Sequence, residues 1–172
     1  MDYHERKQIG DKYEQIIGDW LEEEGYGVIY ASRIGGMSAP AMRGKILPDI
    51  LACRNGKSTW IEIKHYEKAV LNQTIGALVH GIPVKYLNDY YSVSSSSGLD
   101  AMVLVVEGNQ VEAEILIISV RKILSNSIPC LCAGCRANQR CVLPEMKKQV
   151  YWLKNKMTKI GTIHGGKIRR MK

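Results

Sequence analysis

Two acidic residues and a lysine are spaced so that a single β-hairpin would bring them together. Asp49 precedes one apolar run, and Glu62 and Lys64 end the next one, on the far side of Asn55-Gly56. Asn-Gly favours a two-residue turn because both of its positions tolerate positive φ. With this turn, the numbers of paired residues sum to 111. Asp49 then lies opposite Glu62, and Lys64 shares their face of the hairpin.

This constellation suggests metal-assisted chemistry on phosphodiesters. Two carboxylates about 5 Å apart repel each other, and a hard divalent cation such as Mg²⁺ removes that penalty. Lys64 could then orient an attacking water or stabilise developing negative charge. The opposite face carries Ile50, Ile61 and Ile63, which we expect to anchor the hairpin in a core. The alternative is a solvated hairpin face of mixed charge without a catalytic role.

The order Pro48-Asp49, then Glu62-Ile63-Lys64, resembles the motif of the PD-(D/E)xK nuclease superfamily. The resemblance implies an α/β restriction-endonuclease-like fold over about residues 5–120, with a mixed central sheet flanked by helices. It also implies that Asp49, Glu62 and the Ile63 carbonyl bind Mg²⁺ or Mn²⁺ and that Lys64 positions the attacking water. Archaeal Holliday junction resolvases are similar in the first half of the chain.

An amphipathic helix is predicted over residues 5–24, from apolar residues at helical spacing and from Gly25 as a stop. Glu14 lies at the margin of its apolar stripe. A first-helix Glu helps to build the metal site in many nucleases of the resembled superfamily, and Glu14 matches that position. The alternative for Glu14 is an ordinary boundary residue.

The remaining elements are predicted from apolar runs and turn signals. A loop over 34–47 would overhang the site, where Arg43 and Lys45 could hold phosphates. The other expectations are a strand at 28–32, a helix at about 66–80, an irregular segment at 86–100, strands at 101–107 and 110–118, and a short helix at 120–125.

Four of the five cysteines, Cys130, Cys132, Cys135 and Cys141, fall within twelve residues. Such density in a chain without secretory features favours a metal site over disulfides. Four thiolates suit structural Zn²⁺, and a 4Fe-4S cluster is the alternative. The last three cysteines are similar to those of iron–sulfur nucleases, although the fourth ligand of those proteins lies far upstream.

Basic residues are concentrated at the end of the chain. Residues 146–172 carry nine Lys/Arg and no acid, whereas residues 1–145 carry 15 Lys/Arg and 17 Asp/Glu. We therefore expect Lys167, Arg169 and Arg170 to contact the DNA backbone, with a solubilising tail as the alternative. The predicted division is a nuclease core at 1–128, a cysteine-rich loop at 129–145 and a basic segment at 146–172.

Together these patterns predict a divalent-metal-dependent DNA nuclease. A dimeric Holliday junction resolvase is one alternative, and a non-catalytic DNA-binding module with a zinc knuckle is another. DNA is the expected partner, with a homodimer left open. The longest apolar runs are too short to span a membrane and the start is polar, so the expected location is the cytoplasm, or the host cytoplasm for a viral protein.

Overall fold

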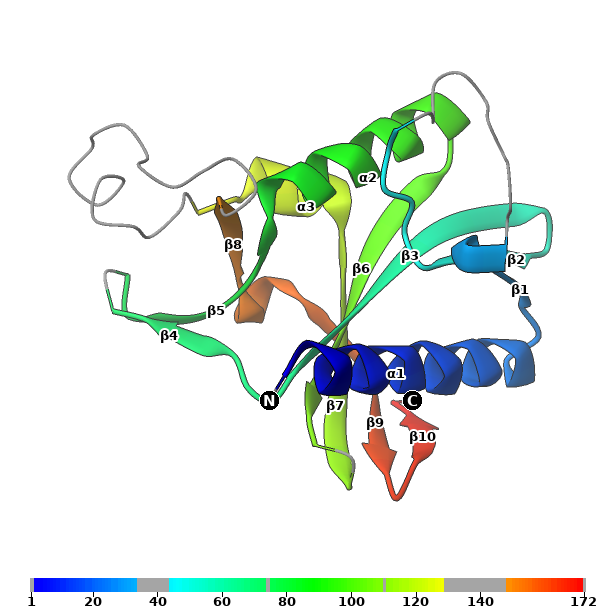
Figure 1. The fold of residues 1–172 in the computed structure, drawn as a ribbon, viewed down its shortest axis with the longest axis horizontal. Helices are drawn as coiled ribbons and strands as arrows, with labels where there is room; N and C mark the ends of the chain where they lie inside the picture. The colour runs from blue at the N-terminus through cyan, green and yellow to red at the C-terminus, as the bar shows by residue number, and fades with distance from the viewer. Residues whose placement is uncertain (1, 34–43, 74, 110, 129–147, 172) are drawn as a thin grey trace.

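The computed structural model describes the chain except for residues 1, 34–43, 74, 110, 129–147 and 172 (Figure 1). The described elements are α1 (Tyr3–Glu23), β1 (Gly27–Tyr30), η1 (Ala31–Arg33), β2 (Ile50–Arg54), β3 (Lys57–Tyr66), β4 (Val70–Asn72), β5 (Ala77–Pro83), α2 (Val84–Ser97), β6 (Asp100–Gly108), β7 (Glu112–Ser119), α3 (Val120–Ser125), β8 (Gln149–Leu153), η4 (Lys154–Lys156), β9 (Thr158–His164) and β10 (Lys167–Arg170).

A seven-stranded sheet forms the centre of the fold, in the order β1-β2-β3-β6-β7-β9-β10. Strands β3 and β6 are parallel, and the other neighbouring pairs are antiparallel. A smaller sheet of order β4-β5-β8 lies beside it. The predicted α/β class, a mixed central sheet flanked by helices, is confirmed.

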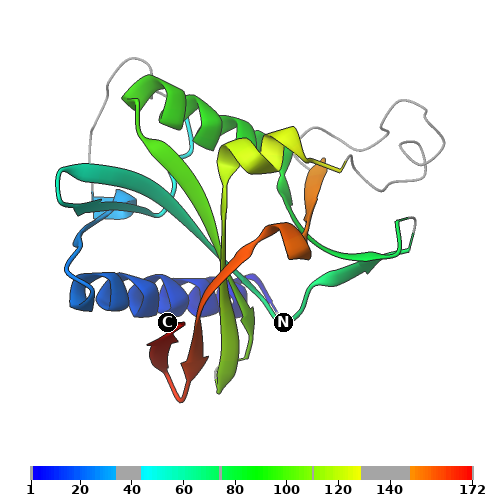
Figure 2. The ribbon, with the colours of Figure 1, turned by 180° about the vertical axis from the view of Figure 1, so that it is seen from behind.

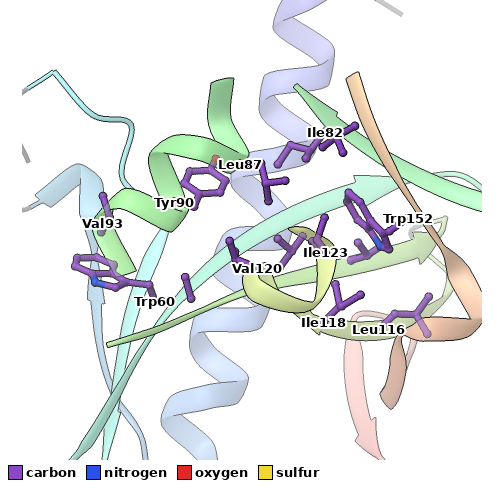
Figure 3. Packing of buried hydrophobic residues seen from close by; sticks show 14 residues of the cluster. Trp60, Ile82, Leu87, Tyr90, Val93, Leu116, Ile118, Val120, Ile123 and Trp152 are labelled. Atoms are coloured by element: carbon purple, nitrogen blue, oxygen red, sulfur yellow. The ribbon is translucent and has the colours of Figure 1, made fainter. Parts of the chain in front are cut away.

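Each face of the central sheet has its own core. Helix α1 lies across one face, whereas α2 and α3 lie on the other (Figures 1 and 2). The α1 side buries Tyr13, Ile17 and Leu21 of the helix against sheet residues that include Ile61 and Ile63. The core on the α2 side contains residues of both helices, the central sheet and the small sheet, among them Trp60, Leu87, Tyr90, Ile123 and Trp152 (Figure 3).

The predicted hairpin of β2 and β3 is confirmed in its register. The pairs run from Ile50 with Ile61 to Arg54 with Lys57, and every pair sums to 111. Asn55 and Gly56 have φ of 51° and 72°, as the two-residue turn requires. Ile50, Ile61 and Ile63 are buried in the α1-side core.

The helix predicted over 66–80 is wrong, because this segment forms β4 and β5. Gly76 has φ of 62°, which suits a turn and interrupts a helix. Strand β5 also pairs with β8, whose residues come about 70 positions later in the chain. This long-range pairing outweighs the local helical spacing, and Val70, Leu71 and Leu78 remain exposed.

The irregular segment predicted over 86–100 is also wrong, because residues 84–97 form α2. Leu87, Tyr90 and Val93 recur at helical spacing and are buried against the sheet. Gly98, with φ of 68°, ends the helix in the left-handed conformation. The serine run, which favoured a loop, is accommodated because Ser97 Oγ donates to the Val93 carbonyl at 2.7 Å.

The remaining elements fall close to their predicted positions. Helix α1, strand β1, strands β6 and β7 and helix α3 lie at or near the ranges expected from the apolar pattern. The basic C-terminal region contributes β8 to the small sheet and β9 and β10 to the central sheet. None of the described helices is both long and apolar enough to cross a membrane.

Candidate active site

Strand β3 points its two polar motif residues away from α1. Ile61 and Ile63 face α1, so the alternating side chains of Glu62 and Lys64 lie on the α2 side. Glu62 is only 1% exposed, and one of its carboxylate oxygens, Oε1, forms an ion pair with Lys64 Nζ. A carboxylate is thus buried on the sheet face with its cationic partner two residues away on the same strand.

Asp49 enters the site directly before β2 begins. Its carbonyl accepts a hydrogen bond from Ala31 N at 2.8 Å, which fixes the backbone beside η1. Its side-chain Oδ2 accepts from Ile63 N at 2.7 Å. The carboxylate therefore sits at the open end of the β2–β3 ladder, next to Glu62, as the hairpin register predicts.

Burial and the closeness of like charges together set the electrostatics of this site. Burial, followed by the charge of Glu62, raises the pKa of Asp49 to about 7. For Lys64, burial lowers the pKa, but the attraction of Glu62 and Asp49 outweighs burial and leaves a net increase. Lys64 therefore stays protonated and neutralises part of the carboxylate charge.

Glu14 of α1 lies close enough to Asp49 and Lys64 for their charges to shift its pKa. Burial, followed by the charge of Asp49, raises the pKa of Glu14 to about 7. Glu14 also lines a cavity of about 360 Å³ whose wall includes Lys7, Asp11, Tyr30 and Ser32. The half-buried first-helix Glu thus interacts electrostatically with Asp49 and Lys64, and its cavity is lined by α1, Tyr30 and Ser32 rather than by the motif residues.

Helix α2 supplies neighbours that the sequence analysis missed. The Lys64 ammonium lies 6.0 Å from the centre of the Tyr86 ring. Burial and the adjacent charge of Glu62 raise the pKa of the buried Tyr90 hydroxyl. Asp89, between them on the helix, accepts a hydrogen bond from Ile46 N at 3.3 Å. The spacing of Leu87, Tyr90 and Val93 after Pro83 was the signal that could have revealed this helix.

The oxygens of the site fit a divalent cation. Glu62 Oε2 is buried and accepts no hydrogen bond of good geometry from the described residues. Within the same part of the chain, no three His, Cys, Asp or Glu side chains gather tightly enough to hold a metal ion. Mg²⁺, however, is commonly bound by one or two carboxylates, with waters and substrate phosphates completing its shell. Asp49, Glu62 and the Ile63 carbonyl provide such a partial set.

The other predicted site residues are not gathered here. Arg43 and the four cysteines of 130–141 lie outside the described residues. Lys45 lies near the site and contacts Asp89. Lys167, Arg169 and Arg170 lie on β10, four positions from β3 in the sheet order, or about 19 Å at the usual strand spacing. Arg170 also forms an ion pair with Glu24 at 3.0 Å.

A mixed sheet with Asp49, Glu62 and Lys64 at the open end of a hairpin resembles the PD-(D/E)xK nucleases in its motif and in the order of its elements. The resemblance predicted from the sequence is supported by comparison with known families. Residues 5–75 match the family model described as archaeal Holliday junction resolvase (hjc). The matched span contains Glu14, Asp49, Glu62 and Lys64.

Comparison with solved structures gives a weaker likeness. The Holliday junction resolvase Hjc from the archaeal hyperthermophile Archaeoglobus fulgidus is 17% identical, with a TM-score of 0.47. The likeness covers 65% of this chain and 78% of the resolvase chain. A search of curated proteins gave no match.

Proposed function

We propose that this protein is a Holliday junction resolvase, a metal-dependent endonuclease that cuts DNA strands at four-way junctions. The match of residues 5–75 to the resolvase family model carries the proposal, because this span includes all four candidate catalytic side chains. The geometry supports it independently through the juxtaposed acids, the adjacent lysine and the buried oxygen Oε2 of Glu62, which accepts no hydrogen bond of good geometry within the described part of the chain. The broader prediction of a general metal-dependent DNA nuclease is thereby narrowed to a substrate class.

Each group has a distinct role in the proposed reaction. Asp49, Glu62 and the Ile63 carbonyl would hold the cation, and Glu14 would add negative charge close to Asp49. When bound, Mg²⁺ or Mn²⁺ activates water and neutralises charge on the scissile phosphate. Lys64 orients the attacking water and stabilises the charge that develops on the phosphate oxygens. The release of Lys64 from its ion pair with Glu62 would make the lysine available for this role.

We further propose that Lys167 and Arg169 contact duplex DNA away from the cleavage site. Their strand, β10, is an edge of the central sheet. Its distance from β3 would let these residues contact an arm of the four-way junction that is not being cut. Phosphate contacts of this kind position a nucleic acid without reading its sequence. Resolution of a junction requires two incisions, so a homodimer is the expected active form.

We expect the protein to cleave a synthetic four-way junction at least about tenfold faster than a linear duplex of the same sequence, in Mg²⁺ or Mn²⁺. The two nicks should fall symmetrically on opposing strands, and EDTA should abolish them. Denaturing gels with each strand labelled in turn measure rate and position together, and light scattering gives the oligomeric state. Equal rates on the linear duplex would favour a general nuclease, and binding without cleavage would favour a DNA-binding module.

We also propose that Cys130, Cys132, Cys135 and Cys141 bind a structural metal ion. Purified protein should contain about one zinc per chain, and replacing Cys132 and Cys135 with Ser should release it. Elemental analysis measures zinc and iron directly, and visible absorbance reports a 4Fe-4S cluster. Preparations that fold normally with neither metal would contradict the proposal, whereas iron with acid-labile sulfide would favour the cluster.

A further inference from the structure

A two-lysine cluster on a buried carboxylate lies beside the candidate active site. Asp89 of α2 is 5% exposed, and its Oδ2 accepts a hydrogen bond from Lys85 Nζ at 2.8 Å. Its Oδ1 lies 3.6 Å from Lys45 Nζ. The cluster thus joins a helix to the segment that leads into Asp49, and it combines two positive charges with one negative charge.

The two ammonium groups are held in place but not buried. The side chains of Lys45 and Lys85 are each 38% exposed, whereas that of Asp89 is 7% exposed. An ammonium has three donor hydrogens, so contact with one carboxylate leaves donors on each lysine. Those donors and one net positive charge are presented at the protein surface.

The position of the cluster relates it to the cleavage site. Lys45 comes four residues before Asp49, and Asp89 also binds the backbone between them through Ile46 N. Lys85 adjoins Tyr86, whose ring lies 6.0 Å from the ammonium of the candidate catalytic Lys64. Lys85 and Asp89 therefore belong to the helix that covers the same side of the sheet as the candidate catalytic acids.

A purely structural clamp does not explain why there are two cations. The backbone N–H of Ile46 and the ammonium of Lys85 already give Asp89 two donors and a neutralising charge. Burial raises the pKa of Asp89, but the hydrogen bonds from Lys85 and Ile46 N and the charges of the two lysines outweigh it and lower the pKa, so the carboxylate remains ionised. A second, half-exposed lysine adds surplus positive charge at the rim of a site that is otherwise acidic.

We propose that Lys45 and Lys85, held by Asp89, bind a backbone phosphate of the DNA strand next to the phosphate that is cleaved. The inference deepens the proposed resolvase function by assigning the contact that sets the substrate strand in register with Asp49 and Glu62. Asp89 is a positioning residue, because it acts through the lysines and the backbone of Ile46. An ammonium pair fixed before binding loses less side-chain entropy when the phosphate arrives.

The first test measures the salt dependence of binding to a fluorescent four-way junction in EDTA, where cleavage is absent. Lys45→Ala/Lys85→Ala should weaken binding about tenfold and reduce the slope of log K against log salt by about 0.9 for one lost phosphate. Lys45→Arg/Lys85→Arg, which keeps both charges, should retain the slope. Lys122→Ala on α3 removes another exposed lysine and serves as the matched control.

The second test replaces single phosphates near the cut by uncharged methylphosphonates. One such replacement, adjacent to the scissile bond, should weaken DNA binding by the wild type about tenfold. The same replacement should not change the DNA affinity of the double alanine variant. The inference would be overturned if the folded double alanine variant kept the wild-type salt slope, or if methylphosphonates weakened binding equally in both proteins. It would also be overturned if the wild-type protein did not bind DNA. Binding as expected without cleavage in Mg²⁺ would remove the proposed nuclease activity and leave the phosphate site in place.

Discussion

Asp49→Asn is expected to slow junction cleavage by about 10²–10³-fold or more while junction binding changes by only a few-fold. The amide keeps the size of the side chain and can still accept the hydrogen bond from Ile63 N. It removes one of the two anionic groups that would hold the cation, on which charge stabilisation at the phosphate depends. Single-turnover cleavage with saturating protein measures this loss separately from affinity.

Two further substitutions test whether the loss of cleavage comes from the candidate active site. Lys64→Ala should give a loss of similar size, because it removes the ammonium beside Glu62. Glu67→Gln, an exposed acid three residues beyond the motif, is the matched control and should cleave at the wild-type rate. If Asp49→Asn and Lys64→Ala both retained full cleavage, the activity would lie elsewhere or in a contaminant.

In metal-free buffer at pH 8, the same Asp49→Asn substitution is expected to stabilise the protein by about 2 kcal/mol, or roughly 5 °C in Tm. Burial and Glu62 raise the pKa of Asp49 from 3.8 to about 7. Between these two values the folded protein binds more protons than the unfolded chain. Stability therefore falls as pH rises from about 4 to about 7, and asparagine avoids this loss. Thermal unfolding in EDTA at several pH values measures the difference.

Divalent metal should reverse the order of stability. A cation that binds only the folded protein raises Tm with concentration, so Mg²⁺ or Mn²⁺ should stabilise wild type and have little effect on Asp49→Asn. Near pH 4 the wild type and variant should differ little, and Glu67→Gln should follow wild type throughout. A variant less stable than wild type in EDTA at pH 8 would show that the acids do not repel each other in the folded state.

The β2–β3 hairpin could be predicted in detail because the residues that determine it are close in sequence. Asn55-Gly56 sets the turn, and the alternation of isoleucines with Glu62 and Lys64 sets the face. The motif Pro48-Asp49 with Glu62-Ile63-Lys64 then suffices for the resemblance to the PD-(D/E)xK nucleases. Glu14 could be placed because an amphipathic helix fixes the direction of each side chain relative to its apolar stripe.

The second half of the site could not be predicted because it depends on distant partners. The helical spacing at 66–80 is real, but β5 pairs with β8 from a remote part of the chain. The serines at 94–97 suggested a loop, yet the hydroxyls of Ser94 and Ser97 donate to carbonyls within or just beyond α2, whose buried face decides its structure. With α2 missed, Asp89 and Lys85 could not be placed beside the acids.

The arrangement of strands also governs when the fold can form during synthesis. Strand β9 completes the central sheet beside β7, and β8 completes the small sheet beside β5. A nascent chain that has emerged only to residue 128 would expose two unpaired edges, each able to recruit a foreign strand. Emergence of β8 and β9 from the ribosome is thus the step that protects both edges, and translation interrupted before these strands should give aggregates rather than a smaller working protein.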